Sequence, residues 1–207
     1  MPPARLAEFL SPYNDTPVDP EDGGAFVPGV SFSSKAELYA AEAQALTDAR
    51  NQLYAGISSG ELTAADLTSP YALIDIHAAC YGSIWAWAGM IRSRELSIGV
   101  APENIREALY SELDQLTWQI EHGDEVGLAP EFIAMGAHHH LVKIHPFTDG
   151  NGRVTRLYAD VLLLAMTGNQ IFDWSDKPVY FDALRRADAT MNPDELLSIV
   201  DVVHLGH

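Results

Sequence analysis

Two stretches of helix-spaced apolar residues, 129–145 and 151–168, are separated by only a short break, and this arrangement constrains the fold more than any other feature. In both stretches apolar side chains recur every three or four residues, which indicates amphipathic helices. The first helix should stop before Pro146, because proline disfavours the helical conformation of the preceding residue. The second should begin at about Asn151 and end at Gly168, a favourable C-terminal residue. The sequence therefore predicts a tight helix–loop–helix unit.

Five further segments have features of helices, so we expect a mainly α-helical fold. They cover residues 33–53, 69–84, 102–122, 177–189 and 192–203. Ser33 or Ser34, followed by Glu37, fits the capping box that starts many helices. One short strand-like run ends at Gly99 and lies within residues 93–105, where we expect a small β-hairpin flap.

The 207 residues are expected to form one domain, residues 33–207, preceded by an extended arm, residues 1–32. The arm is rich in Pro, Gly, Asp and Glu and has no sustained period. Phe26 and Val27 are the apolar residues that would attach it to the domain.

The balance of charge argues against several classes of partner. The chain has 12 Lys+Arg and 29 Asp+Glu, a formal net charge of −17, and such a surface repels nucleic acids and anionic membranes. The most apolar run, residues 161–166, is too short to cross a bilayer. The single cysteine, Cys80, excludes an internal disulfide and fits a reducing compartment, so we expect a cytoplasmic protein.

The break between the two central helices has the composition of an anion site. Gly150 and Gly152 allow a tight turn and a close approach of the backbone to a ligand. A helix that begins at about Asn151 presents unpaired N–H groups and the positive end of its dipole, to which the side-chain amide adds a donor. Arg153 and Arg156 project from one face of this helix and suit phosphate oxygens.

Two titratable residues flank this anion site. A carboxylate at Asp149 would repel a phosphate unless a cation lay between them, which argues for a shared Mg²⁺. His145, at the end of the preceding helix, is the residue here that can take up a proton near pH 7. Asp160, one turn beyond Arg156, is placed to steady that arginine.

Residues 145–156, HPFTDGNGRVTR, resemble the Fic-domain motif His-x-Phe-x-Asp/Glu-Gly-Asn-Gly-Arg-x-x-Arg at every defined position. Residues 85–99 resemble the tryptophan–glycine block and flap of that family, and residues 138–147 its active-site helix. The arm and the short flap are most similar to the Fic subgroup called mobile mystery protein B. The resemblance implies a Fic-type helical bundle and transfer of AMP from ATP to a protein hydroxyl.

The resemblance also implies roles for the residues of the loop. His145 would be the base that deprotonates a target Ser, Thr or Tyr, and Asp149 would hold Mg²⁺ on the α- and β-phosphates. The anion hole would be formed by Gly150, Asn151 and Gly152.

Outside the loop, the implied site is completed by three further residues. Arg153 would bind the β-phosphate and Arg156 the γ-phosphate, while Ile98 in the flap matches a position that clamps the target by backbone pairing. Tyr180 and Asp188 lie where family members bind the adenosine.

Many Fic proteins are silenced by a helix whose motif, Ser/Thr-x-x-x-Glu-Gly/Asn, brings a glutamate onto the second arginine. Neither Ser33 to Glu37 nor Thr117 to Glu121 is followed by the required Gly or Asn. We therefore expect a separate, antitoxin-like inhibitor protein and a toxin-like enzyme.

Three other interpretations remain open from the sequence. A metal-dependent hydrolase would use the histidine cluster, His138, His139 and His140, with His145 and Asp149 to bind Zn²⁺ or Fe²⁺. A second interpretation is a nucleotide-binding regulatory module without catalysis. A third keeps the fold but changes the reaction to transfer of UMP or phosphate, or to removal of AMP.

Overall fold

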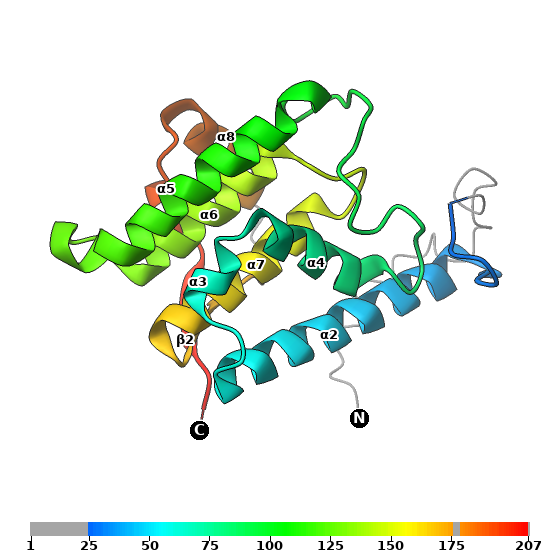
Figure 1. Ribbon diagram of the computed structural model, residues 1–207, viewed down its shortest axis with the longest axis horizontal. Coiled ribbons are helices and arrows are strands. Elements are labelled where there is room, and N and C mark those ends of the chain that lie inside the picture. Colours follow the sequence, from blue (N-terminus) through cyan, green and yellow to red (C-terminus); the bar gives the residue numbers. More distant parts are fainter. Residues whose placement is uncertain (1–24, 176–178, 207) are drawn as a thin grey trace.

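The computed structural model describes residues 25–175 and 179–206, and most of them are helical (Figure 1). The helices are α2 (Lys35–Ser59), α3 (Ala64–Leu67), α4 (Pro70–Tyr81), the 3-10 helix η2 (Pro102–Asn104), α5 (Ile105–Val126), α6 (Pro130–Ile144), α7 (Asn151–Thr167), α8 (Tyr180–Thr190) and α9 (Asp194–Leu197). The strands β1 (Gln170–Asp173) and β2 (Asp201–His204) pair antiparallel. The expectation of a mainly α fold is confirmed.

Local sequence explains where the early helices begin. The N-cap of α2 is Ser34, whose hydroxyl accepts a hydrogen bond from the Glu37 backbone N–H. The Glu37 carboxylate accepts from the backbone N–H of Ser33, one residue before the N-cap, so the expected cap forms without the reciprocal bond of a full capping box. Pro70 occupies the first turn of α4, where a missing N–H costs nothing. Both helices therefore start as the sequence predicts.

The core is centred on α7, which lies between α2 and α4 on one side and α6 on the other (Figure 1). Its fully or almost fully buried residues include Val154, Leu157, Tyr158, Val161, Leu162 and Leu163. Helix α5 covers α6 with the apolar face that its spacing predicts: Ile105, Leu109, Leu113 and Leu116. The helix–loop–helix unit is thus held by packing on several sides.

The expected β-hairpin at residues 93–105 is not formed, and residues 93–101 run as a loop without strand. The backbone on either side of this segment pairs with the end of α6 and with the loop after it, residues 145–150, which is called the motif loop: Arg92 N–H donates to the Pro146 carbonyl at 2.9 Å, and Val100 N–H donates to the Ile144 carbonyl at 3.2 Å. These hydrogen bonds satisfy backbone N–H and C=O groups that would otherwise pair between the two strands of a hairpin.

The helix predicted for residues 192–203 is also largely wrong. Only Asp194–Leu197 is helical, and the valine-rich end of the segment forms β2, with Val202 opposite Phe172. A neighbouring strand and the β-preference of valine outweigh the helical spacing. In the helix predicted for residues 177–189, the first helical residue is Tyr180, and Lys177 lies outside the described residues.

The predicted N-terminal arm lies mostly outside the described residues, of which the first is Ala25. Val27 N–H donates to the Ile84 carbonyl, and the Phe26 ring centroid lies 4.8 Å from that of Trp85.

Over the described ranges, no helix combines the length and the apolar character needed to cross a bilayer.

Candidate active site

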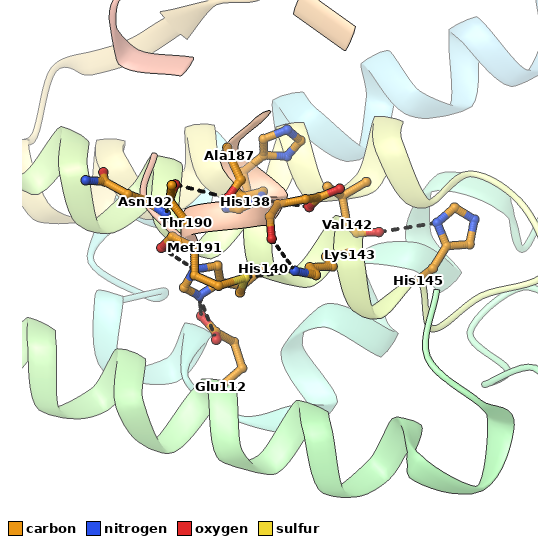
Figure 2. A network of polar contacts seen from close by, with 12 residues as sticks. Glu112, His138, His140, Val142, Lys143, His145, Ala187, Thr190, Met191 and Asn192 are labelled. Carbon is orange, nitrogen blue, oxygen red and sulfur yellow. Dashed lines mark hydrogen bonds and ion pairs between the residues drawn. The ribbon is translucent and has the colours of Figure 1, made fainter. Parts of the chain in front are cut away.

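His145 ends helix α6 in the left-handed conformation, with φ of 55°, as expected for a residue that proline excludes from the helix. Its Nδ1 lies 3.3 Å from the carbonyl oxygen of Val142 (Figure 2). Because a carbonyl can only accept, this contact requires the proton on Nδ1 and leaves the lone pair on Nε2. Partial burial, and then the charge of Arg92, lower the pKa of His145, so the ring is neutral at pH 7.

Arg92 is a buried residue that fixes the position of His145. Its Nε donates to the His145 carbonyl at 2.7 Å, and its two terminal nitrogens donate to the carbonyls of Arg94 and Val100. One side chain therefore joins the end of α6 to the loop that replaces the expected hairpin. The sequence analysis missed this residue, which lies within the block that resembles the Fic flap.

The loop at residues 93–101 crosses directly over His145. A Cβ added at Gly99 would lie 2.5 Å from the Cβ of His145, and φ of +92° at this glycine also disfavours any side chain. Ile98, the residue just before it, is 60% exposed. The structure thus places Gly99, the residue after the predicted flap residue, against the predicted base.

The motif loop rests on a buried histidine, His77, that the sequence analysis did not single out. Its ring stacks on Phe147 with centroids 3.7 Å apart. Nδ1 accepts a hydrogen bond from the Gly89 N–H, so Nε2 carries the proton and donates to the Asp149 carbonyl at 3.1 Å. Burial lowers the pKa of His77 to about 4, which keeps this ring neutral.

Asn151 holds the loop closed through its side chain. Its Oδ1 accepts from the Phe147 N–H at 2.9 Å, and its Nδ2 donates to the Phe147 carbonyl at 2.8 Å. The expectation that this amide would itself face an anion is wrong, because both of its polar atoms are buried and used within the loop. Gly150 is required on two grounds, since its φ is +76° and a Cβ there would lie 2.5 Å from the ring of Tyr81.

The N-terminus of α7 is open to a ligand. Its N-cap, Gly150, makes no side-chain hydrogen bond to the first turn, so backbone N–H groups there stay uncapped. Asp149 is 64% exposed at the side chain, and its carboxylate lies 3.6 Å from Arg153 Nη2. One exposed carboxylate beside an anion site fits Mg²⁺, which commonly binds one or two carboxylates together with phosphates and water.

The position of Arg153 is fixed by a residue of helix α2. Its Nη1 lies 2.7 Å from a carboxylate oxygen of Glu42, a buried residue of α2. The other oxygen of Glu42 accepts from the indole N–H of Trp85 at 2.8 Å. The guanidinium also lies over the Tyr81 ring, 5.1 Å from its centroid, and the side chain remains 37% exposed.

Arg156 points into the same region, one turn further along α7. Its Nε donates to the Gly152 carbonyl at 3.0 Å, and its guanidinium carbon lies 5.8 Å from the centre of the Tyr180 ring. The expected contact between Asp160 and Arg156 is not formed, because the Asp160 carboxylate accepts hydrogen bonds from the Phe172 N–H and the Trp174 indole N–H instead. None of the described glutamates is bonded to Arg156.

The histidine cluster does not converge on one point. Its members have separate partners: His138 with Thr155 and Tyr180, His139 with Asp188, and His140 with Glu112. Figure 2 shows His140 directed toward Glu112 on α5 and away from His145. Within the part of the chain that the structure describes, no three His, Cys, Asp or Glu side chains are grouped to hold a metal. The geometry needed for the hydrolase is therefore absent there.

Two cavities meet at Arg153. One, of ≈ 400 Å³, is lined by Leu46, Thr47, Arg50, Arg153, Arg156, Leu157, Asp160 and Trp174. The other, of ≈ 430 Å³, is lined by Lys35, Leu38, Tyr39, Glu42, Trp85, Asp149 and Arg153. Because Arg153 lines both, the two cavities adjoin beside the first turns of α7 and are partly basic, and together they are called the cleft below.

The sequence of residues 67–163 matches the Fic/DOC family. A "Protein adenylyltransferase Fic" of Nematostella vectensis is 32% identical over 122 residues, which are 56% of this chain and 28% of that protein. A "Protein adenylyltransferase fic-1" of Caenorhabditis briggsae is 40% identical over 83 residues, 37% of this chain and 15% of that protein. The chain thus spans less than a third of the length of these curated relatives.

Solved structures show the same fold. The N-terminal Fic domain of a VirB-translocated effector from Bartonella quintana superposes with a TM-score of 0.63 at 19% identity, covering 84% of this chain and 86% of that one. The BepC protein of Bartonella tribocorum, solved with bound AMPPNP, has a TM-score of 0.62 at 17% identity, covering 86% and 96%. The motif at residues 145–156 lies within the part of the chain, residues 67–163, whose sequence matches the Fic/DOC family.

Proposed function

We propose that this protein is a protein adenylyltransferase, which transfers AMP from ATP to a Ser, Thr or Tyr hydroxyl of a target protein. One observation carries the proposal: His145, with its lone pair on Nε2, ends α6 at the loop that leads to the uncapped N-terminus of α7 and its two arginines. The names of the relatives from Nematostella vectensis and Caenorhabditis briggsae support the same activity.

The reaction is an in-line displacement at the α-phosphorus. Nε2 of His145 accepts the proton of the target hydroxyl, whose oxygen forms a bond to the α-phosphorus while the bond to the β-phosphate oxygen breaks. Pyrophosphate leaves with the electron pair of that bond. Such a transfer needs positioning and charge stabilisation rather than a covalent enzyme intermediate.

The phosphates would be held at the N-terminus of α7 and by the two arginines that follow it. Backbone N–H groups of Gly150, Asn151 and Gly152 form the anion hole, Arg153 binds the β-phosphate and Arg156 the γ-phosphate. Asp149 would hold Mg²⁺, which when bound neutralises negative charge on the phosphates. The exposure of the Asp149 side chain, 64%, supports this assignment.

The target segment would pair with the backbone near Ile98. The support is positional: the residue is exposed, and the adjacent Gly99 lies against His145, so a hydroxyl-bearing residue held there is within reach of the base. Control would come from a separate antitoxin-like protein, a proposal supported by the lack of a bond between Arg156 and any described glutamate.

The test uses nucleotides labelled on the α-phosphate. The protein is incubated with Mg²⁺, a cell lysate and α-labelled ATP, UTP or GTP, and labelled proteins are separated on a gel. We expect label on protein from ATP. Label from UTP alone would correct the nucleotide. In a parallel incubation with γ-labelled ATP, label there and none from α-labelled ATP would show phosphate transfer in place of AMP transfer.

A further inference from the structure

Arg50, a residue of α2 that lies outside the Fic motif, faces the proposed nucleotide site. It lines the ≈ 400 Å³ cavity together with Arg153 and Arg156, which come from α7. Three guanidinium groups from two helices thus surround one cavity. The whole chain has only 12 Lys+Arg among 207 residues, so this gathering is not a sample of an evenly basic surface.

The three arginines differ in how their charge is balanced. Arg153 pairs with Glu42 and lies near Asp149. Neither Arg50 nor Arg156 is within ion-pair distance of a carboxylate in residues 25–175 and 179–206. The cavity therefore holds two guanidinium groups without a counter-charge of their own.

Asp160, the carboxylate that also lines this cavity, does little to supply that charge. The Asp160 carboxylate accepts hydrogen bonds from Phe172 N–H and Trp174 Nε1–H on the same oxygen, and these bonds tie it to the segment after α7. Burial raises the pKa of Asp160 to about 7, although these hydrogen bonds and the charges of Arg50 and Arg156 oppose the shift. The two arginines are therefore available to bind a ligand anion in this cavity.

We infer that Arg50 is a third nucleotide-binding arginine, which with Arg156 binds the terminal phosphate of a nucleoside triphosphate. The inference rests on the proposed function. Arg156 lies one helical turn beyond Arg153 and so further from the loop that carries His145. Phosphates that start at the uncapped end of α7 reach Arg153 first and the pair Arg50–Arg156 last. A triphosphate is long enough to reach that pair, and a diphosphate is not.

The test compares nucleotides that differ only in the number of phosphates. Affinities for ATP, ADP and AMP are measured by calorimetry at constant ionic strength with Mg²⁺, for the wild type, Arg50→Gln and Arg50→Lys. Arg50 is exposed on α2, and thermal unfolding of each variant checks that the fold is retained. Arg106→Gln, which removes the same charge from an exposed position on α5 outside this cavity, is the matched control.

We expect Arg50→Gln to weaken ATP binding about tenfold, because a charge-assisted hydrogen bond to phosphate is lost, and to leave the ADP and AMP affinities within about twofold. Arg50→Lys should retain part of the ATP affinity, and Arg106→Gln all of it. Equal losses for ATP and ADP, or an unchanged ATP affinity, would overturn the inference.

The outcome is separable from that of the proposed function. An ATP-specific loss in Arg50→Gln supports the inference even if the wild type transfers no AMP. Normal AMP transfer by the wild type, together with unchanged ATP affinity in Arg50→Gln, overturns the inference alone. A wild type that binds no ATP overturns both.

Discussion

The carboxylate of Glu42 lies 2.7 Å from the guanidinium of Arg153, although the two residues are 111 positions apart in the sequence. The contact joins α2 to the first turn of α7 and so fixes one wall of the cleft. Trp85 donates to the same carboxylate, which leaves the buried acid fully engaged. The orientation of Arg153, the proposed β-phosphate ligand, is therefore set by a helix that contributes no residue to the motif.

Replacing Glu42 by Gln should lower the free energy of unfolding by about 1–2 kcal/mol, because the charged hydrogen bond to Arg153 is weakened inside the protein. Urea denaturation at pH 7 measures the change. Glu61→Gln, at an exposed position, is the control and should have little effect. Equal stabilities of Glu42→Gln and the wild type would show that the contact does not hold α2 against α7.

Gly150→Ala and Gly136→Ala should change stability in opposite directions. At Gly150 the new Cβ meets the Tyr81 ring at 2.5 Å and the backbone has φ of +76°, so we expect a loss of at least about 1–2 kcal/mol and of ATP binding. At Gly136, within α6, the nearest atom is 3.9 Å away, and alanine should stabilise the helix by up to about 1 kcal/mol. Thermal unfolding of both variants checks the sign, and two losses of similar size would contradict the geometry.

The pair His140–Glu112 should make stability depend on pH. Burial favours the neutral ring, but the hydrogen bond and charge of Glu112 outweigh it and raise the pKa of His140 above 6.5. A raised histidine pKa adds stability that is complete below about pH 6.5 and is lost as the pH rises through the raised value.

The unfolding free energy of the wild type minus that of Glu112→Gln should therefore be largest near pH 5.5 and shrink toward pH 8.5. Denaturant titrations across this range give the difference, with Glu107→Gln, exposed on the same helix, as the control. A difference that stays constant with pH would mean that Glu112 does not raise the pKa of His140.

The transfer rate should follow the ionisation of His145. Because burial and the charge of Arg92 lower the pKa of this ring, the rate at saturating ATP should rise with pH, with a midpoint below 6.5, and stay level through pH 8. Initial rates between pH 5 and 8 test this. A midpoint above 7 would mean that another group limits the reaction.

Local patterns account for the parts of the structure that the sequence predicts. Each of these patterns determines the conformation only of residues close to it in the sequence. They are the cap at Ser34, the end of α6 before Pro146, and the glycines around Asn151. The strand β2 was missed because its formation depends on β1, a partner about thirty residues away, and not on its own spacing.

The same limit applies to the candidate site. The motif residues are adjacent in the sequence and were found by their order. Other residues reach the site from distant elements: Arg92, His77, Glu42 and Arg50. No local sequence pattern predicts which distant residue each of them contacts. The side chain of Asn151 was misjudged for a related reason, since its buried hydrogen bonds to Phe147 depend on how the loop closes.

The most direct measurement separates binding from transfer in His145→Ala. ATP affinity is measured by calorimetry and AMP transfer with α-labelled ATP, for this variant and for the control His122→Ala, at a partly exposed position of α5. If His145 is the base, the variant keeps its ATP affinity within about threefold while transfer falls by roughly a hundredfold or more, and the control matches the wild type in both. Transfer by His145→Ala at the wild-type rate would contradict the account.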